Sequence, residues 1–75
     1  METLREARIR RLLSIRGLAK RAGVSPQTVQ SIESGQVLAQ LGSIRKLATA
    51  LEVEPPAIVE FRQAMEAAAA GKEAA

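Results

Sequence analysis

The sequence predicts an all-α fold of five short helices, and three observations support this fold class. Apolar residues recur with helical spacing, most regularly at Ile44, Leu47, Ala48 and Leu51, which occupy positions i, i+3, i+4 and i+7. No stretch alternates polar and apolar residues as a strand would. Serine caps, glycines and a proline pair divide the chain into segments of helical length. A chain of 75 residues suffices for one small domain with a compact core.

The first helix is expected over about residues 2–12. Its inward face consists of Leu4, Ala7, Arg8 and Leu12. The second helix follows the N-cap candidate Ser14 and covers about residues 15–22. Its inward residues are Leu18, Ala19 and Ala22. Gly23 supplies the left-handed residue that ends this helix, so a tight turn leads directly into the next one.

The third helix, over about residues 26–34, has clear signals at both ends. Ser25 is a good N-cap, Pro26 fits the first turn, and Gly35 ends the helix. At about 100° per residue, Val29 and Ile32 fall on one side and face the core. The other side carries only neutral hydrogen-bonding groups, which belong to Gln27, Gln30, Ser31 and Ser34.

The fourth helix is expected over about residues 41–52 and ends before the proline pair at 55–56. The fifth helix begins at these prolines and turns Ile58, Phe61 and Met65 to one side. We expect residues 1–66 to form one domain. Residues 67–75 are rich in alanine and have little to bury, so they are expected to form a frayed C-terminal tail.

The composition argues against several classes of protein. The sequence contains no cysteine and no histidine, so it lacks the residues that most often form disulfides, bind metals or act as general bases. We therefore expect no enzymatic activity, no metal and no cofactor. No apolar run approaches the roughly 18 residues of a membrane span, and no signal-peptide core follows the basic N-terminus. A cytoplasmic protein without membrane contact is the expectation.

Charge is distributed unevenly along the chain. Residues 1–31 carry seven basic and two acidic side chains, a net charge of +5, whereas residues 32–75 carry a net charge of −2. A basic half beside a weakly acidic half favours one side that faces a polyanion.

Residues 15–34 have the pattern of a helix-turn-helix motif, in which a glycine turn leads into a helix with a polar outer face. Glutamine donates and accepts hydrogen bonds at once, which suits adenine N6 and N7 in the major groove, and hydroxyl groups serve either role. Ordinary solvated helices also carry neutral polar residues. The capped turn and the basic segment before it nevertheless favour DNA binding.

The stretches "LAKRAGVSPQTVQSIESG" and "IRKLATALEVEP" resemble the helix-turn-helix domain of the Cro and lambda-repressor family, and the resemblance extends without gaps over residues 4–58. It implies a compact five-helix, lambda-repressor-like helix-turn-helix domain within residues 1–66. It also implies a transcriptional regulator, expected to be a repressor, that binds double-stranded DNA as a homodimer. The helix at 26–34 would then be the recognition helix.

The resemblance assigns roles position by position. Contacts with base edges are expected from Pro26, Gln27, Thr28, Gln30 and Ser31. Core positions are Leu18, Ala19, Val24, Val29, Ile32, Leu47 and Leu51. Arg8 and Glu33 match a pair that bridges the first helix to the end of the recognition helix. Glu33 lies at the margin of the inward face, where an unpaired carboxylate would be costly, so we expect a structural salt bridge.

Contacts with DNA phosphates are expected from Arg16, Ser25, Lys20, Arg45 and Lys46. Arg16 is the strongest of these, because it lies in the first turn of the second helix, beside the DNA in related complexes. Exposed basic residues are, however, often merely solvated. Four features depart from the family pattern. Leu12 replaces a helix-ending glycine, Gly17 lies within a helix, and Ile15 replaces a glutamine that binds phosphate. The backbone N–H groups at that helix start remain available to phosphate. Val37 and Leu38 stand where relatives tend to carry basic or polar loop residues.

The connection around Val37 and Leu38 carries no charge and allows two interpretations. Its apolar side chains either fold back over the core with Leu41, or they form a contact between subunits. Together with Phe61 and Met65, they are the candidate dimer contacts. A two-fold dimer would place two recognition helices roughly 34 Å apart on a palindromic operator.

The sequence therefore predicts a sequence-specific DNA-binding regulator that inserts the helix at 26–34 into the major groove. The alternative is a protein-interaction module, antitoxin-like or otherwise bound to a protein partner, that keeps the fold but has weak or lost DNA binding. Ile15 and the apolar connection favour that alternative. An enzyme is a distant third, because no paired carboxylates or phosphate-binding loop stand out.

Overall fold

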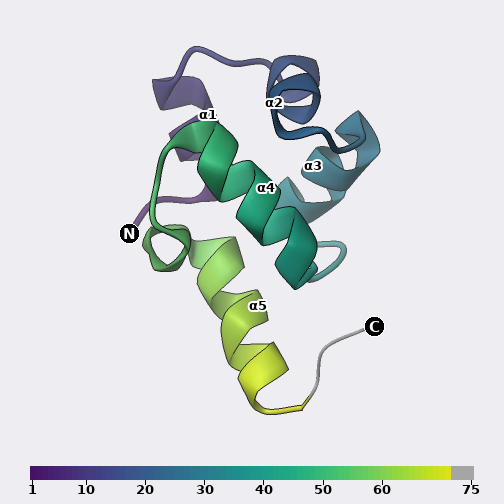
Figure 1. Cartoon of the computed structure of the whole chain (residues 1–75), viewed down its shortest axis with the longest axis vertical. Coiled ribbons are helices and arrows are strands. Elements are labelled where there is room, and N and C mark those ends of the chain that lie inside the picture. The colour runs from purple at the N-terminus through teal and green to yellow at the C-terminus, as the bar shows by residue number, and fades with distance from the viewer. Residues whose placement is uncertain (72–75) are drawn as a thin grey trace.

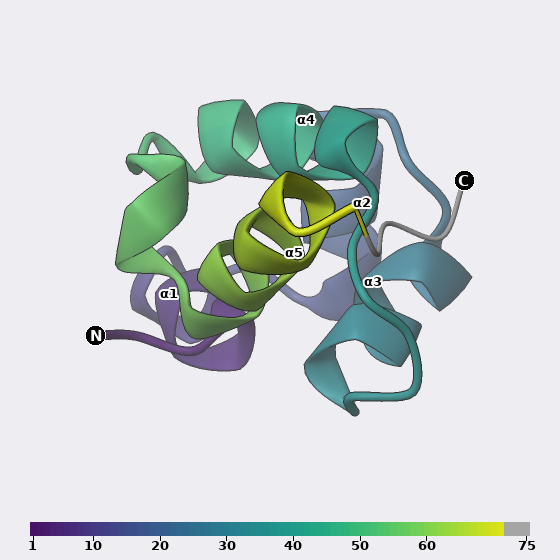
Figure 2. The ribbon, with the colours of Figure 1, turned by 90° about the horizontal axis from the view of Figure 1, so that it is seen from below.

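Five α-helices and one short 3₁₀ turn make up the structure, a computed structural model that describes residues 1–71. The helices are α1 (Leu4–Arg10), α2 (Ile15–Ala22), α3 (Pro26–Glu33), α4 (Leu41–Leu51) and α5 (Val59–Ala69), and the 3₁₀ turn η1 spans Pro55–Ala57. In Figure 1, α4 crosses the centre of the molecule, with α2 and α3 above and to its right and α5 below. Seen from below, α1 and α3 lie on opposite sides of α5 (Figure 2). The expected all-α class of five helices is confirmed.

Side-chain caps fix the starts of the first three helices. Thr3 and Glu6 form a capping box at α1, in which each side chain accepts a hydrogen bond from the backbone N–H of the other. Ser14 caps α2 by accepting the N–H of Gly17, and Ser25 caps α3 by accepting the N–H of Thr28. These bonds satisfy backbone donors that a helix start otherwise leaves unpaired.

Glycines end the helices on either side of the turn. Gly23 adopts the left-handed conformation, with φ at 75°, directly after α2, and Gly35 does the same at 78° after α3. A side chain at either position would be strained in this conformation, so glycine is the natural residue there. The short connection from Gly23 to Ser25 sets α3 closely against α2 (Figure 1).

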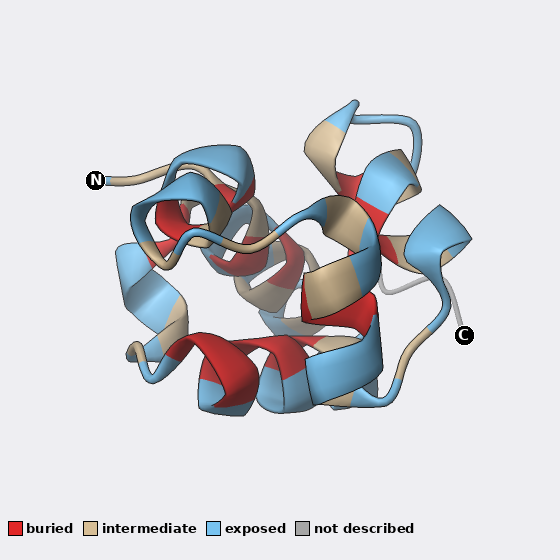
Figure 3. Cartoon of the chain, turned by 90° about the horizontal axis from the view of Figure 1, so that it is seen from above, coloured by how far each residue is buried: buried red, intermediate tan, exposed pale blue. Residues whose placement is uncertain are grey.

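The core lies where the five helices face one another (Figure 3). Its largest fully buried side chains are Phe61, Leu4, Leu18, Ile32, Leu47, Leu51, Ile58 and Val29. Of the seven core positions assigned by resemblance, six are buried, and Val24 is partly buried and packs against the core. Burial of this apolar surface is the main force that holds the short helices together.

The N-terminal segment pairs with the chain just before α5, which the sequence pattern did not indicate. Glu2 donates its N–H to the Ala57 carbonyl at 3.2 Å, and Val59 donates to the Glu2 carbonyl at 2.8 Å. This isolated parallel bridge brings the Glu60 carboxylate within 2.8 Å of the Leu4 N–H. Glu60 therefore satisfies a free backbone donor at the start of α1 and ties the two ends of the domain together.

Leu12 is a correction to the expected first helix. We placed it on the inward face, but α1 ends at Arg10, and Leu12 is 92% exposed with φ at 59°. The chain turns here through the left-handed conformation, which swings the side chain away from the core. A leucine thus occupies a backbone position that favours glycine.

The fifth helix also starts later than expected. The proline pair forms η1, Ile58 is extended, and α5 begins only at Val59. The helix continues to Ala69, into the alanine-rich segment, and residues 72–75 of the expected tail lie outside the described residues. None of the helices within residues 1–71 combines the length and hydrophobicity needed to cross a bilayer.

Candidate nucleic-acid interface

The outer face of α3 is polar and uncharged. Pro26, Gln27 and Gln30 are exposed, and Thr28 and Ser31 are partly exposed. Val29 and Ile32, on the opposite side, are buried in the core and anchor the helix. All five residues expected to contact base edges therefore lie on one short helix and reach solvent together.

Hydrogen bonds within this face orient some of its groups. The Ser25 and Thr28 hydroxyl oxygens lie 2.8 Å apart, and the Gln27 amide nitrogen donates to the Ser31 hydroxyl at 3.2 Å. The second bond turns the amide of Gln27 along the helix and leaves its carbonyl oxygen as an acceptor. These groups are arranged before any ligand binds, which lowers the entropic cost of recognition.

Arg8 and Glu33 fix the position of α3. The Arg8 Nε and Nη2 atoms donate to the two carboxylate oxygens of Glu33 at 2.7 and 3.2 Å, and Nη1 donates to the Leu13 carbonyl at 2.9 Å. The two side chains are only 11% and 9% exposed. One guanidinium thus connects α1, the turn after it and the end of α3 through charge-assisted bonds in a largely dry setting.

Several other basic side chains are engaged in ion pairs. Arg10 binds the Glu2 carboxylate through two bonds of 2.8 and 2.7 Å. The hydrogen bonds from Arg10 hold the pKa of the Glu2 carboxyl below its ordinary value and raise the pKa of Arg10. Arg11 and Arg21 both approach Glu52, at 3.5 and 3.3 Å. A last pair, Arg62 with Glu66, lies along α5.

The four basic residues expected to contact phosphate differ from these paired residues. Arg16, Lys20, Arg45 and Lys46 are exposed, and none pairs with an acidic residue within residues 1–71. Arg5 on α1 is likewise exposed and forms no ion pair within these residues. Arg16 and Lys20 are four residues apart and so lie on one face of α2. Their charges remain available to an external anion.

Ile15 packs towards the core and offers no polar group at the start of α2. It is the first residue of α2, is partly buried and lies against the core. Two residues later, a Cβ added to Gly17 would come within 3.2 Å of the capping hydroxyl of Ser14. Glycine therefore leaves room for the cap that stabilises this helix start.

The connection between α3 and α4 does not fold back over the core as one interpretation proposed. Val37 and Leu38 are 54% and 45% exposed, and Leu41 is also exposed, whereas Ala39 is the buried residue of this segment. Val37 and Leu38 line a hollow together with residues of α3. Ala39 anchors the connection, and this leaves the larger side chains outside.

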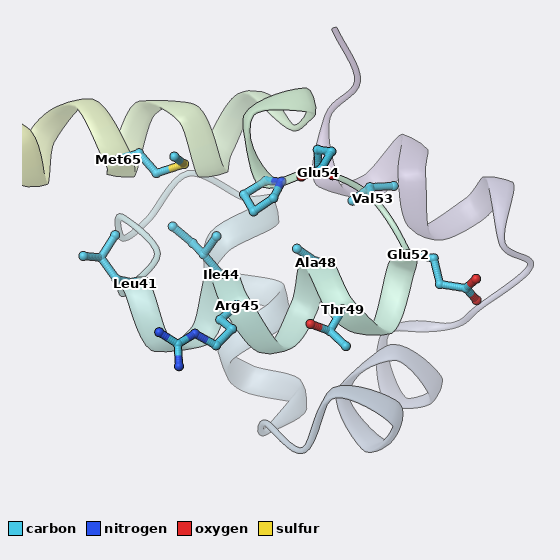
Figure 4. Close-up of a pocket in the computed structure, with 10 residues that line it drawn as sticks. Leu41, Ile44, Arg45, Ala48, Thr49, Glu52, Val53, Glu54 and Met65 are labelled. Atoms are coloured by element: carbon cyan, nitrogen blue, oxygen red, sulfur yellow. The ribbon is translucent and has the colours of Figure 1, made fainter.

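A second hollow lies between α4 and α5 (Figure 4). Its apolar wall contains Leu41, Ile44 and Ala48 from α4 and Met65 from α5. Arg45 lies towards the end marked by Leu41, Glu52 lies at the opposite end, and Glu54 lies across the hollow from Ala48.

Phe61 is a correction to the candidate dimer contacts. Its side chain is fully buried at 0% exposure, because α5 turns it into the core of its own chain. Met65, one turn later, is partly buried and lines the hollow between α4 and α5.

Metal-ligand geometry and three comparisons with known proteins bear on the family of this chain. Within residues 1–71, no three His, Cys, Asp or Glu side chains come together as metal ligands would. A comparison with models of protein families matches residues 4–58 to a family described as helix-turn-helix. Comparisons with curated proteins and with solved structures gave no match. The matched residues run from the first residue of α1 to the residue before α5 and include the whole polar face of α3.

Proposed function

Since the chain belongs to the Cro- and lambda-repressor-type family of helix-turn-helix DNA-binding regulators, we propose that it reads a specific double-stranded sequence by inserting α3 into the major groove. Bound at its operator, it represses transcription. The observation that carries this proposal is the outer face of α3, which presents neutral donors and acceptors and no charge.

Base recognition falls to this face. Gln27 and Gln30 are exposed, and an amide suits the N6 and N7 atoms of adenine. The Ser31 hydroxyl holds the Gln27 amide, while Pro26 and Thr28 complete the contact surface at the start of the helix. Arg8 and Glu33 do not contact DNA themselves. Their ion pair holds the end of α3 against α1 and so sets the direction in which α3 projects.

Affinity for the backbone comes from cations beside α3. Arg16 and Lys20 on α2 and Lys46 on α4 contact phosphates, assisted by the Ser25 hydroxyl at the start of α3. Since Ile15 packs inward, the free N–H groups at the start of α2 replace the missing side-chain anchor.

The functional unit is a homodimer. The hollow between α4 and α5 offers apolar side chains and separated opposite charges, with Arg45 near Leu41 and Glu54 across the hollow from Ala48. A two-fold axis across this hollow would bring Arg45 of one subunit to Glu54 of its partner, because such an interface uses the same patch twice. In this arrangement Arg45 forms an ion pair between the subunits and does not contact a DNA phosphate.

Charge reversal tests the dimer. Arg45→Glu should weaken self-association in sedimentation equilibrium, as should Glu54→Arg, and the combined exchange should restore it. Failure of the combined exchange to restore association would place the interface elsewhere.

A second candidate function, a protein-binding module without DNA affinity, is favoured by Ile15. Binding to a random duplex at low salt separates the two. A DNA-binding protein should bind even the wrong sequence weakly, with an affinity that falls steeply as salt rises. The same measurement on Arg16→Ala/Lys20→Ala should show weaker binding and a shallower salt dependence. No binding by the natural chain would support the protein-binding module instead.

A further inference from the structure

The hollow beside α3 has no charged lining. It encloses about 510 Å³, and its walls come from α3, the connection after it and the start of α4. The lining residues are Gln27, Thr28, Ser31, Ile32, Val37, Leu38, Ala39, Gln40 and Ser43. Three of the residues proposed to contact bases thus share one concave surface with the apolar pair Val37 and Leu38.

This surface does not suit a phosphate. No residue between Glu33 and Arg45 is charged, so the connection offers no cation to the DNA backbone. Val37 and Leu38 instead keep 54% and 45% of their surface exposed to water. Burying these side chains on binding is favourable only against another apolar group.

The major groove supplies one such group. Base edges there present hydrogen-bond donors and acceptors, and the C5-methyl group of thymine is the apolar feature among them. The hollow is continuous with the polar face of α3, so a base pair read by Gln27 would lie beside Val37 and Leu38.

We infer that Val37 and Leu38 form an apolar socket for a thymine methyl group and are specificity-determining residues of the operator contact. This inference rests on the proposed function. A glutamine that reads adenine and a socket that takes a thymine methyl group select the same kind of base pair, so the two features reinforce a preference for A·T at this part of the site.

Replacing thymine with deoxyuridine tests the socket, because it removes only the methyl group. A duplex recovered by selection from a random pool is prepared with each thymine replaced in turn, and affinity is measured for the natural chain. We expect at least one replacement to weaken binding about fourfold, the effect of burying one methyl-sized group. Val37→Ser/Leu38→Ser should bind the thymine and uracil duplexes equally.

Ile9→Ser is the matched control, because Ile9 is similarly exposed, at 52%, but lies on α1 outside the hollow. This variant should keep the fourfold preference. The inference is overturned if the natural chain is indifferent to every replacement, if the selected site contains no thymine, or if the preference survives in Val37→Ser/Leu38→Ser. It is also overturned if that variant loses self-association while keeping the preference, since the pair would then contact a second copy. If no duplex is enriched at all, the proposed function itself fails.

Discussion

The region around α1 and the surface of α2 and α3 use their polar residues in opposite ways. Around α1, Arg8, Arg10 and Arg11 all pair with carboxylates, and Thr3 and Glu6 cap the helix. On α2 and α3, Arg16, Lys20, Gln27 and Gln30 are exposed, and within the described residues none forms an ion pair. Each region has one exception, because Arg5 on α1 is exposed without an ion pair in residues 1–71 and Arg21 on α2 pairs with Glu52. Side chains of the same kinds therefore stabilise the fold in one region and remain available to a ligand in the other.

This contrast shows how a small chain with a net charge of +3 divides its cations between ion pairs and free surface. Ion pairs around α1 neutralise Arg8, Arg10 and Arg11. The exposed cations that form no ion pair within residues 1–71, at positions 5, 16, 20, 45 and 46, keep their attraction for anions.

Arg8→Ala should cause the largest loss of stability, about 3 kcal/mol, because it leaves Glu33 nearly buried without its partner. Urea denaturation measures the change. Arg62→Ala is the control, since its pair on α5 is exposed and contributes at most about 0.5 kcal/mol. Similar losses in the two variants would mean that the Arg8 pair is not the structural link between α1 and α3.

Gln27→Ala should weaken binding to a selected duplex by about 2 kcal/mol and relax the preference at one base position. Affinities for the selected duplex and its single-base variants give both quantities. Gln63→Ala, which removes an exposed amide from α5, should change neither. An equal loss on every sequence would show that Gln27 contacts only the backbone.

Arg16→Ala should weaken binding to all sequences alike, by about fivefold at low salt, and reduce the slope of affinity against salt by about 1. Titrations at several salt concentrations provide the slope. Arg10→Ala removes the same charge from a residue already paired with Glu2, and it should leave the slope nearly unchanged. Equal slopes in the two variants would contradict the division between paired and available cations.

Leu12→Gly should stabilise the fold by about 0.5–1 kcal/mol, because glycine adopts the left-handed conformation at φ 59° without strain. Thermal unfolding detects the change as a rise of several degrees in Tm. Leu12→Ala removes the same exposed side chain but keeps the strain, so a comparable rise in that variant would rule out this cause.

The smallest predicted effect is the loss of stability at low pH when the Glu2 carboxyl is protonated. The bond from Arg10 lowers its pKa in the folded state below the ordinary value of 4.5. The stability gained from this pair is therefore present above that value and is lost as the pH falls through the lowered folded value. Tm values at pH 6 and pH 3 should differ slightly less in Glu2→Gln than in the natural chain. An NMR titration that finds an unshifted Glu2 carboxyl would contradict the geometry.

Local signals predicted much of the fold. The caps Ser14 and Ser25, the left-handed Gly23 and the periodicity of α4 each depend on neighbouring residues, and each appears in the structure. The Leu12 position was predicted wrongly because helical periodicity was extended through a residue where the backbone turns.

Contacts between distant parts of the chain leave no signal in the local sequence. The bridge between Glu2 and Ile58 and the Glu60 cap of α1 join residues more than 50 positions apart, and nothing in their local sequence marks them. Arg11 and Arg21 are nearer to Glu52 in the sequence, but nothing in their local sequence marks these pairs either. At the candidate site, residue types on α3 indicated the polar face, but only the folded chain showed that Val37 and Leu38 share a hollow with it.

The most direct test of the contrast between the two regions is an NMR titration of the labelled protein with a random duplex at low salt. The account predicts that backbone amide signals shift at the start of α2 and along the first turns of α3, near Arg16 and Gln27, while signals at the paired end of α1, from Arg8 to Arg10, and those of α5 stay in place. Shifts confined to α1 or α5, or no shifts at all, would contradict the claim that the polar groups of α2 and α3 are kept free for DNA.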